Sequence, residues 1–306
     1  MKPTVLGLVG PTASGKSGLA LKAAQALGGE IVSMDSMQVY IGMDIGTAKA
    51  TKQDQELVPH HMIDIVDPET PFSVAEYQRM ARDVIDDIHA RGKLPVLCGG
   101  TGLYLRALSR DMAFGEAQKD ITIRERYQQL ALVEGNEAVH RILYEKDPET
   151  ARRLHPNNLR RVIRALEVLE LTGKPLSAQQ MPRDEDGPYD MRLYAICWPR
   201  HELYERINLR ADRMLARGLL KEVKTLMDAG VNPQAQSMQG LGYKELFPYL
   251  KGEAALGDAM DTMQRRTRNY AKRQMTWFTA DERVTWLNGR DSMDTHLETI
   301  LKDIQA

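Results

Sequence analysis

The sequence has few cysteines, few aromatic residues and almost no net charge across its 306 residues. Its two cysteines, Cys98 and Cys197, lie in apolar runs that resemble strands, with no zinc-ligand spacing around them. We therefore expect buried, reduced thiols and no cysteine nucleophile. No apolar run approaches the ~20 residues of a membrane-spanning helix, and the first expected strand begins too early to leave room for a signal peptide. These absences favour a cytoplasmic enzyme without a membrane partner, and we expect it to be monomeric.

The net charge of −1 predicts no general attraction to a polyanion, but the basic residues are unevenly distributed. Residues 150–174 carry six lysines or arginines against two glutamates, and residues 264–274 carry five against no acidic residue. Two such stretches in a neutral chain are typical of a nucleic-acid-binding groove. A solvated helix face explains either stretch alone equally well.

A complete G-x-x-x-x-G-K-[ST] motif follows the apolar run of residues 4–9 and precedes an expected helix. Its residues are Gly10, Pro11, Thr12, Ala13, Ser14, Gly15, Lys16 and Ser17. At such a strand-to-helix turn, backbone N–H groups and the helix dipole converge on an anion. We expect Lys16 to reach a terminal phosphate and the Ser17 hydroxyl to coordinate Mg²⁺. The loop alone does not identify the reaction, because kinases, NTPases and diphosphate-releasing transferases all use it.

Six short apolar runs are expected to form strands, namely residues 5–9, 31–33, 62–66, 95–98, 193–197 and 284–287. Helical patterns lie between them, including residues 73–90, which open with a Ser73–Glu76 capping box. This alternation predicts an α/β fold of the P-loop NTPase type, with a mostly parallel sheet flanked by helices.

The strand pattern stops between residues 120 and 176. Helical patterns follow one another there, at residues 121–134, 136–145, 148–154 and 158–172. We predict an all-helical insertion at residues 119–187 within a catalytic core of residues 1–118 and 188–306. The polar, proline-flanked stretch 182–188 is expected to be a linker.

Asp35 follows the second expected strand, and Thr101 lies in a glycine-rich turn after the fourth. The carboxyl ends of parallel strands border the ligand crevice, so Asp35 should face the phosphate loop. It suits a general base or a Mg²⁺ ligand, and a structural cap is the alternative. Thr101 can present its hydroxyl to a substrate, although such a turn is also common in purely structural positions.

Two later segments are rich in basic residues. Arginines recur every three or four residues from Arg206 to Arg217, away from the apolar stripe of an expected helix, and one or two of them can reach a diphosphate. Residues 268–278 interleave basic and aromatic side chains, which suits phosphate contacts combined with base stacking. Trp277 and Phe278 are equally compatible with the core.

The motifs together resemble the bacterial tRNA dimethylallyltransferases of the IPP transferase family, from about Leu6 to Trp286. The segments that carry the resemblance are GPTASGKS, SMDSMQVYIGMDIGTAK, HHMIDIVDP, GGTGLYLRAL, HPNNLRRVIRALEV, GLGYKEL and AKRQMTWF. The phosphate loop is widely shared, whereas the DIGTAK, GGT and KRQ-x-T-W elements are specific. The family often closes its loop with threonine; Ser17 here supplies the same hydroxyl.

The resemblance implies transfer of a dimethylallyl group from dimethylallyl diphosphate to N6 of the adenosine at tRNA position 37, with release of diphosphate. Asp35 would then accept the proton, Thr101 would align the reactants, and Lys16 and Arg210 would stabilise the leaving diphosphate with Mg²⁺ at Ser17.

The resemblance also implies an RNA-binding set and places the insertion on the anticodon stem-loop, with Arg160, Arg161 and Arg164 on phosphates. The RNA-binding set is Asp35, Ser36, Met37, Gln38, Thr101, Ile123, Leu159, Arg160, Arg161, Val162, Ile163, Gln239, Gly240, Leu241, Gly242, Tyr243, Lys244, Lys272, Arg273, Gln274, Met275, Thr276, Trp277, Phe278 and Thr279.

Two alternatives remain at this point. An adenylate isopentenyltransferase would share the donor site but act on free nucleotides, and it would need neither basic stretch. A small-molecule kinase would bind ATP at the same loop and would need an arginine-rich lid.

Overall fold

A computed structural model describes residues 2–110, 120–178 and 187–305. The chain divides into two compact units, one made of Met1–Arg110 with Gly187–Ala306 and the other of Asp111–Asp186. We call the first the core unit and the second the helical unit, and we describe each by itself. The predicted domain limit at residue 119 and residues 182–186 of the predicted linker lie outside the described residues.

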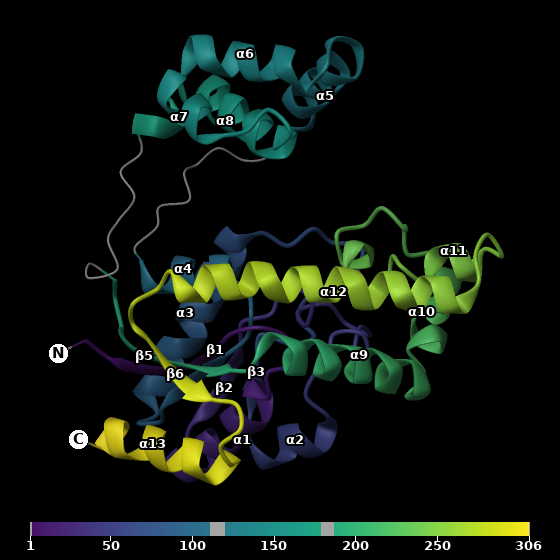
Figure 1. Cartoon of the computed structure of the whole chain (residues 1–306). Helices are drawn as coiled ribbons and strands as arrows, with labels where there is room; N and C mark the ends of the chain where they lie inside the picture. The colour runs from purple at the N-terminus through teal and green to yellow at the C-terminus, as the bar shows by residue number, and fades with distance from the viewer. Residues whose placement is uncertain (1, 111–119, 179–186, 306) are drawn as a thin grey trace. The chain divides into compact units, whose positions relative to one another are not determined.

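Within the described residues, six strands of the core unit form one parallel sheet in the order β3-β2-β4-β1-β5-β6 (Figure 1). The strands are β1 (Thr4–Val9), β2 (Glu30–Ser33), β3 (His60–His61), β4 (Pro95–Cys98), β5 (Asp190–Cys197) and β6 (Val284–Asn288). All five neighbouring pairs are parallel. The sheet confirms the predicted fold class, although β5 begins at Asp190 rather than at Leu193.

Two predictions about this sheet are wrong. Residues 62–66 do not form a strand, because Met62 and Asp64 adopt φ angles of +61° and +52°, which extended backbone does not allow. The Asp64 carboxylate lies 2.5 Å from the ammonium of Lys49, and this tertiary contact accompanies the turn. Cys197, predicted to be buried, is exposed at the last position of β5.

Helices cover both faces of the sheet because successive side chains of a strand point to opposite sides. In β1, Val5 and Val9 join one core cluster, and Leu6 and Leu8 join another. The second cluster lies under α1 (Lys16–Leu27) and α13 (Met293–Gln305). The first lies under α3 (Val74–Ala90), α4 (Gly102–Ser109), α10 (Leu219–Asp228) and α12 (Leu256–Thr279).

The remaining helices of the core unit lie near the sheet edges and along α12. They are α2 (Lys52–Leu57), α9 (Arg200–Ala216), α11 (Phe247–Leu250) and the short 3₁₀ turn η3 (Ser237–Gln239). Leu203 and Ile207 of α9 pack on Ala271 of α12, so these two helices lie against each other. Among the described helices, none is both long and apolar enough to cross a membrane.

The described part of the helical unit contains helices and no strand. It comprises α5 (Ile121–Glu134), α6 (Asn136–Lys146), α7 (Pro148–Arg153), α8 (Leu159–Thr172) and the 3₁₀ turn η1 (Leu176–Ala178). Tyr127, Val139, Leu143 and Leu166 form its small core. Glu167 is fully buried beside that core, where its carboxylate accepts hydrogen bonds from Arg124 and Arg164 and from the Asp120 backbone.

Candidate active site

The predicted phosphate-binding loop lies where β1 ends and α1 begins. Gly10 and Gly15 adopt φ angles of +118° and +102°, a region that side chains disfavour, and Ala13 adopts +64°. Within the described residues, the backbone N–H groups of residues 13–17 find no protein acceptor. The loop and the first turn of α1 therefore present N–H donors that are not used by the fold, which suits the binding of an anion.

The opposite, carbonyl side of the loop is held by a side chain just after β5 and another from α9. The Arg206 Nε donates to the Ala13 carbonyl at 2.9 Å, and the indole N–H of Trp198 donates to the Ser14 carbonyl at 2.9 Å. The Arg206 guanidinium lies 4.1 Å from the centre of the Trp198 ring. These contacts fix the carbonyl groups away from the ligand side, so the N–H groups face the other way.

A cavity of about 790 Å³ adjoins this loop. Lys16, Ser17, Asp35 and Arg210 all line it, although they come from three different segments of the chain, namely the start of α1, the turn after β2 and α9. Three of the four predicted catalytic residues therefore share one cavity with the predicted metal ligand.

Positive charge is held at reduced dielectric in this cavity. Burial lowers the pKa of the Lys16 ammonium. The neighbouring Arg210 lowers this pKa further, whereas Cys98 and Asp35 act to raise it. Burial also lowers the pKa of Arg210, and the Asp35 carboxylate opposes this shift. Cys98, predicted to be buried, is half-buried and lines the same cavity, and burial raises the pKa of its thiol. Two cations thus face a single carboxylate, and a bound anion would relieve their repulsion.

Thr101 differs from the other predicted catalytic residues because it is not among the described cavity-lining side chains. Its Oγ accepts a hydrogen bond from the Ser36 backbone N–H at 3.3 Å. The Asp35 carboxylate in turn accepts one from the Met37 N–H at 2.9 Å. Thr101 therefore shapes the turn that carries Asp35, and the capping contact predicted as an alternative for Asp35 exists alongside its exposure to the cavity.

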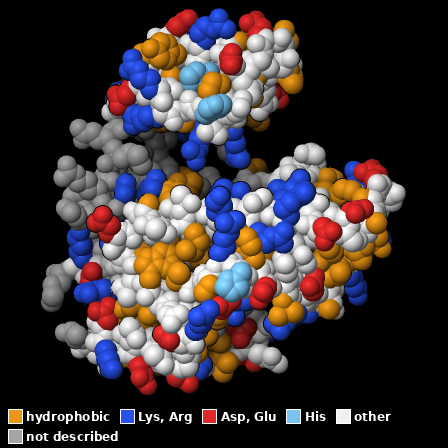
Figure 2. Space-filling view, viewed as in Figure 1, with side chains coloured by type: hydrophobic (Ala, Val, Ile, Leu, Met, Phe, Trp, Pro, Cys, Tyr) orange, Lys and Arg blue, Asp and Glu red, His pale blue; other side chains and the backbone are white. Residues whose placement is uncertain are grey.

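Most of the predicted RNA-binding residues of the core unit also surround this cavity. Those that line it are Asp35, Ser36, Met37, Gln38, Gln239, Gly240, Leu241, Tyr243, Lys244, Arg273 and Gln274. Lys272, Thr276 and Thr279 are exposed on α12, and Lys and Arg side chains gather over this helix in Figure 2. The cavity therefore opens beside a basic surface, as a groove for a polyanion would require.

Comparison with known proteins agrees with this site. The sequence model of the family described as IPP transferase matches residues 38–281. The chain is 48% identical to the tRNA dimethylallyltransferase of Geobacillus thermodenitrificans, over 95% of this chain and 92% of that protein. The chain belongs to the IPP transferase family.

Other members of this family extend the likeness to the whole chain. The tRNA dimethylallyltransferase of Bacillus subtilis is 47% identical, with 97% of this chain and 94% of that protein covered. A tRNA isopentenylpyrophosphate transferase of Bacillus halodurans superposes with a TM-score of 0.75 at 43% identity, covering 99% of this chain and 96% of that one. A eukaryotic dimethylallyltransferase described as acting on tRNA superposes with a TM-score of 0.80 at 30% identity, and the match covers 98% of this chain and 77% of that one.

Gln274 has a different role from the RNA contact that its motif predicts. It is 4% exposed, and its side-chain carbonyl accepts the Thr12 backbone N–H at 2.9 Å while its amide donates to the Gly100 carbonyl at 2.9 Å. A Cβ at Gly100 would lie 2.1 Å from the Gln274 amide nitrogen, so only glycine permits this approach. In this IPP transferase, Gln274 joins α12 to the phosphate loop and to the turn before α4.

Burial corrects two further RNA-contact predictions in the core unit. The Phe278 side chain is 1% exposed and belongs to the main core cluster, and Gly242 is also buried. Tyr243 is 1% exposed in the same cluster, although it also lines the cavity. Trp277 is half-buried, with the Arg106 guanidinium 3.9 Å from its ring centre. Met275 is half-buried as well. The exposed basic residues of α12 are therefore available to a polyanion, whereas Phe278 is not.

In the helical unit too, some of the predicted RNA-contacting residues are buried and others are exposed. Val162 and Ile163 are buried in its core, and Ile123 and Leu159 pack against it. Arg164 is engaged with Glu167, its Nη1 lying 2.6 Å from Oε2, so its predicted phosphate contact is replaced by an internal ion pair. Arg160 and Arg161 are exposed and form no ion pair among the described residues. Only these two arginines of α8 remain for RNA phosphates.

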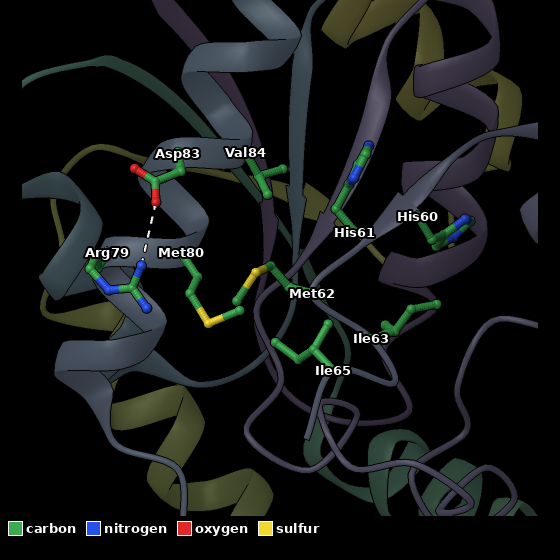
Figure 3. Close-up of a pocket in the computed structure, with 9 residues that line it drawn as sticks. All are labelled: His60, His61, Met62, Ile63, Ile65, Arg79, Met80, Asp83 and Val84. Carbon is green, nitrogen blue, oxygen red and sulfur yellow. Dashed lines mark ion pairs between the residues drawn. The ribbon is translucent and has the colours of Figure 1, made fainter. Parts of the chain in front are cut away.

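A second cavity of about 460 Å³ lies between β3 and α3 (Figure 3). Its lining is largely aliphatic and sulfur-containing, with the Met62 and Met80 side chains side by side and an Arg79–Asp83 ion pair at 3.7 Å on one side. It contains none of the phosphate-loop residues. The central cavity is therefore the candidate active site.

Sequence reasoning missed the residues that hold the site together. Arg206 was grouped with possible diphosphate ligands, whereas it binds the back of the loop, and Arg210 and Arg217 line the cavity. Glu222 received no role, although it contacts a cavity-lining segment more than 170 residues away in sequence. No local pattern marks such partners, because each depends on which distant segment the fold brings beside it.

Proposed function

We propose that this chain transfers a dimethylallyl group from dimethylallyl diphosphate to N6 of the adenosine at tRNA position 37, next to the anticodon. The observation that carries the proposal is the meeting of Lys16, Ser17, Arg210 and Asp35 in one cavity beside a basic helix. The names of the family members support tRNA as the acceptor. A free-nucleotide transferase would need no basic α12 surface, and a kinase would not account for the family membership.

The diphosphate of the donor would bind the open N–H groups of the phosphate loop, with Lys16 and Arg210 beside it. Negative charge increases on the diphosphate as its bond to the dimethylallyl carbon breaks. Fixed cations at reduced dielectric stabilise such a developing charge more than the ground state, and this difference accelerates the reaction. The Arg206 and Trp198 contacts keep the loop in shape for this task.

The residues present fit a Mg²⁺ ion of the phosphate-loop type. Among the described residues there is no cluster of three carboxylate, histidine or cysteine ligands. Ser17 can offer one hydroxyl, leaving the remaining positions to phosphate oxygens and water, which Mg²⁺ commonly keeps. Bound there, the ion would neutralise charge on the diphosphate.

Asp35 would act as the general base towards the acceptor. The N6 amine forms the new bond to the dimethylallyl carbon, the carbon–oxygen bond to diphosphate breaks, and the displaced N6 proton passes to the Asp35 carboxylate. The Met37 N–H donates a hydrogen bond to that carboxylate, and the Thr101 Oγ accepts one from the backbone N–H of the adjoining Ser36. These contacts would orient Asp35, as an efficient base requires.

The adenosine must leave its stack in the anticodon loop to enter the cavity, at a cost of a few kcal/mol. Contacts of Lys272 and Arg273 on α12 with flanking phosphates would offset this cost. We also propose that the helical unit binds the anticodon stem-loop through Arg160 and Arg161. We further propose that the protein acts as a monomer in the cytoplasm.

The deciding experiment incubates the purified protein with tRNA that lacks the position-37 modification and with dimethylallyl diphosphate labelled in its alkyl group. We expect Mg²⁺-dependent transfer of label to the tRNA, abolished by chelation and restored by added Mg²⁺. The matched control is the same tRNA with guanosine at position 37. Label on free AMP but not on tRNA, or transfer from γ-labelled ATP to a metabolite, would contradict the proposal.

A further inference from the structure

Residues 44–49, read as DIGTAK, form part of the cavity lining without belonging to a helix or a strand. Every one of the six residues lines the cavity. A segment of this kind keeps a defined shape only if its backbone N–H and carbonyl groups find partners. The question is which groups fix it.

The carboxylate of Glu222, on α10, fixes the first half of the segment. It accepts hydrogen bonds from the consecutive backbone N–H groups of residues 44–46, at 3.0, 2.7 and 3.0 Å. The Tyr243 hydroxyl donates a fourth hydrogen bond to the same carboxylate at 2.6 Å. Burial and the neighbouring Glu222 raise the pKa of Tyr243, so this hydroxyl stays protonated as a donor. One carboxylate therefore holds three successive peptide units.

The close approach of this backbone to Tyr243 depends on glycine at position 46. A Cβ there would lie 2.5 Å from the Tyr243 ring and 2.7 Å from its hydroxyl oxygen. Tyr243 is 1% exposed within the main core and has no room to retreat. The segment is thus pressed against a fixed ring on one side and bonded to Glu222 on the other.

The second half of the segment orients Gln38. The Gln38 side-chain amide donates to the carbonyls of Thr47 and Ala48 at 3.2 and 3.3 Å, and its Oε1 accepts the Ser33 hydroxyl at 2.8 Å. The Lys49 ammonium closes the turn by binding the Tyr40 carbonyl and the carboxylates of Asp44 and Asp64. A continuous chain of contacts thus runs from Glu222 to Gln38.

The chemistry of this lining differs from that around the phosphate loop. The charge of Lys49 is paired with two carboxylates, and the side chains of Met37, Gln38, Ile45 and Thr47 are neutral. Uncharged hydrogen-bonding groups next to apolar ones suit a heterocyclic base, whereas the cations at Lys16 and Arg210 suit a diphosphate.

We propose that Glu222 is a positioning residue for the acceptor base, acting through residues 44–48 and Gln38 and leaving the diphosphate donor unaffected. The inference rests on the proposed function for the identity of the acceptor. Glu222→Gln keeps the size of the side chain but turns an NH₂ group towards backbone donors, so the segment loses its anchor.

The test uses the full chain and measures three quantities for Glu222→Gln, the milder Tyr243→Phe and the control Glu205→Gln, whose side chain is exposed on the neighbouring α9. These are the affinity for an anticodon stem-loop RNA, the affinity for dimethylallyl diphosphate, and the hydrogen-exchange protection of the amides of residues 44–46. For Glu222→Gln we expect stem-loop affinity to fall about 10- to 100-fold and amide protection to drop, with donor affinity within about 2-fold of wild type. Tyr243→Phe should give a smaller change of the same kind, and Glu205→Gln none.

Unchanged amide protection in Glu222→Gln would show that this carboxylate does not anchor the segment. Equal losses of donor and stem-loop affinity, in step with a lower melting temperature, would show a general structural role and overturn the proposal as well. Failure of the proposed function is distinguishable, because it is judged by transfer of label with the wild type, whereas this proposal is judged by binding and exchange.

Discussion

Two segments contribute to the lining of one cavity, residues 10–17 and residues 44–49, and each contains a run of consecutive backbone N–H groups. In the phosphate loop the N–H groups of residues 13–17 find no acceptor among the described residues. In the second segment the N–H groups of residues 44–46 all donate to the carboxylate of Glu222. A run of backbone N–H groups can therefore serve in two ways. It can bind the anion of a ligand, or it can bind a carboxylate of the protein itself and so fix the shape of a segment.

The two segments are also secured from opposite sides. The phosphate loop is held by its carbonyl groups, through Arg206 and Trp198, so that its N–H groups stay available. Residues 44–46 are held by their N–H groups, and the carbonyls that follow them bind Gln38. Backbone groups that form hydrogen bonds within the protein are no longer available to a substrate. The internal hydrogen bonds of each segment therefore decide which of its groups can bind one.

The largest loss of activity is expected on replacing Asp35, because its carboxylate is the proposed general base whichever of the two segments holds each substrate. Asp35→Asn should reduce the single-turnover rate roughly 10²–10⁴-fold, the usual weight of a general base, while tRNA affinity barely changes. Asp261→Asn, at an exposed position of α12, is the matched control. A near-normal rate for Asp35→Asn would leave only its cap on the Met37 N–H.

Lys16→Ala should give the opposite binding pattern to that of Glu222→Gln. Removing the ammonium from the open set of N–H groups should weaken donor binding and leaving-group stabilisation together, lowering kcat/KM for the donor about 10²–10³-fold. Stem-loop affinity measured without donor should stay at the wild-type value. If stem-loop binding collapsed instead, the phosphate loop would be binding RNA, and the contrast between the two segments would fail.

Gly46→Ala probes the filled segment from its backbone side. The new Cβ meets the Tyr243 ring at 2.5 Å, so the segment must move away from Glu222, at about 1–3 kcal/mol. We expect lower stem-loop affinity with donor affinity retained. Gly257→Ala near the start of α12, where a Cβ meets nothing within 4 Å, is the control. Equal affinities in the two variants would show that residues 44–46 tolerate displacement.

Glu167 of the helical unit is a second carboxylate with several hydrogen-bond donors. Unlike Glu222, it is held mainly by side chains, those of Arg124 and Arg164. Burial raises its pKa, but hydrogen bonds from Arg124 and Arg164 outweigh burial and bring the pKa to about 2, against an ordinary value of 4.5. Its contribution to stability is therefore complete above about pH 4.5 and is lost as the pH falls towards 2. Hydrogen exchange of residues 120–178 in the full chain should show this loss, and Glu167→Gln should be less pH-dependent over the same interval.

The smallest effect is expected at the RNA phosphates, outside both segments. Neutralising Arg161 or Lys272 singly should weaken tRNA binding and reduce the slope of log K against log salt by roughly one contact, equally for different substrate tRNAs. The measurement is a salt titration of tRNA affinity, with Arg164→Gln as a comparison because Arg164 is paired with Glu167. Unchanged slopes for both Arg161 and Lys272 would identify ordinary solvated surfaces.

Sequence patterns predicted the parts of this molecule that depend on neighbouring residues. The phosphate loop, the parallel sheet and the helices of the insertion follow from short-range periodicity and turn residues, and Asp35 follows from its place after a strand. The strand predicted at residues 62–66 failed because an apolar run alone does not reveal the positive φ angles at Met62 and Asp64.

Roles that depend on distant partners were beyond such patterns. Gln274 directly follows Lys272 and Arg273 in the same motif. Its side chain nevertheless points into the protein, where it binds Thr12 and Gly100. Likewise, nothing around Glu222 indicates that residues 44–46 lie beside it. A motif thus identified residues that matter together without showing which of them face a ligand.

The helical unit interrupts the crossover between α4, which ends at Ser109, and β5, which begins at Asp190. Neither of these elements depends on the interruption for its pairing, since β5 forms its ladder with β1 and β6, and α4 packs on α3. The length and surface of this unit can therefore change without disturbing the sheet that positions the cavity-lining residues.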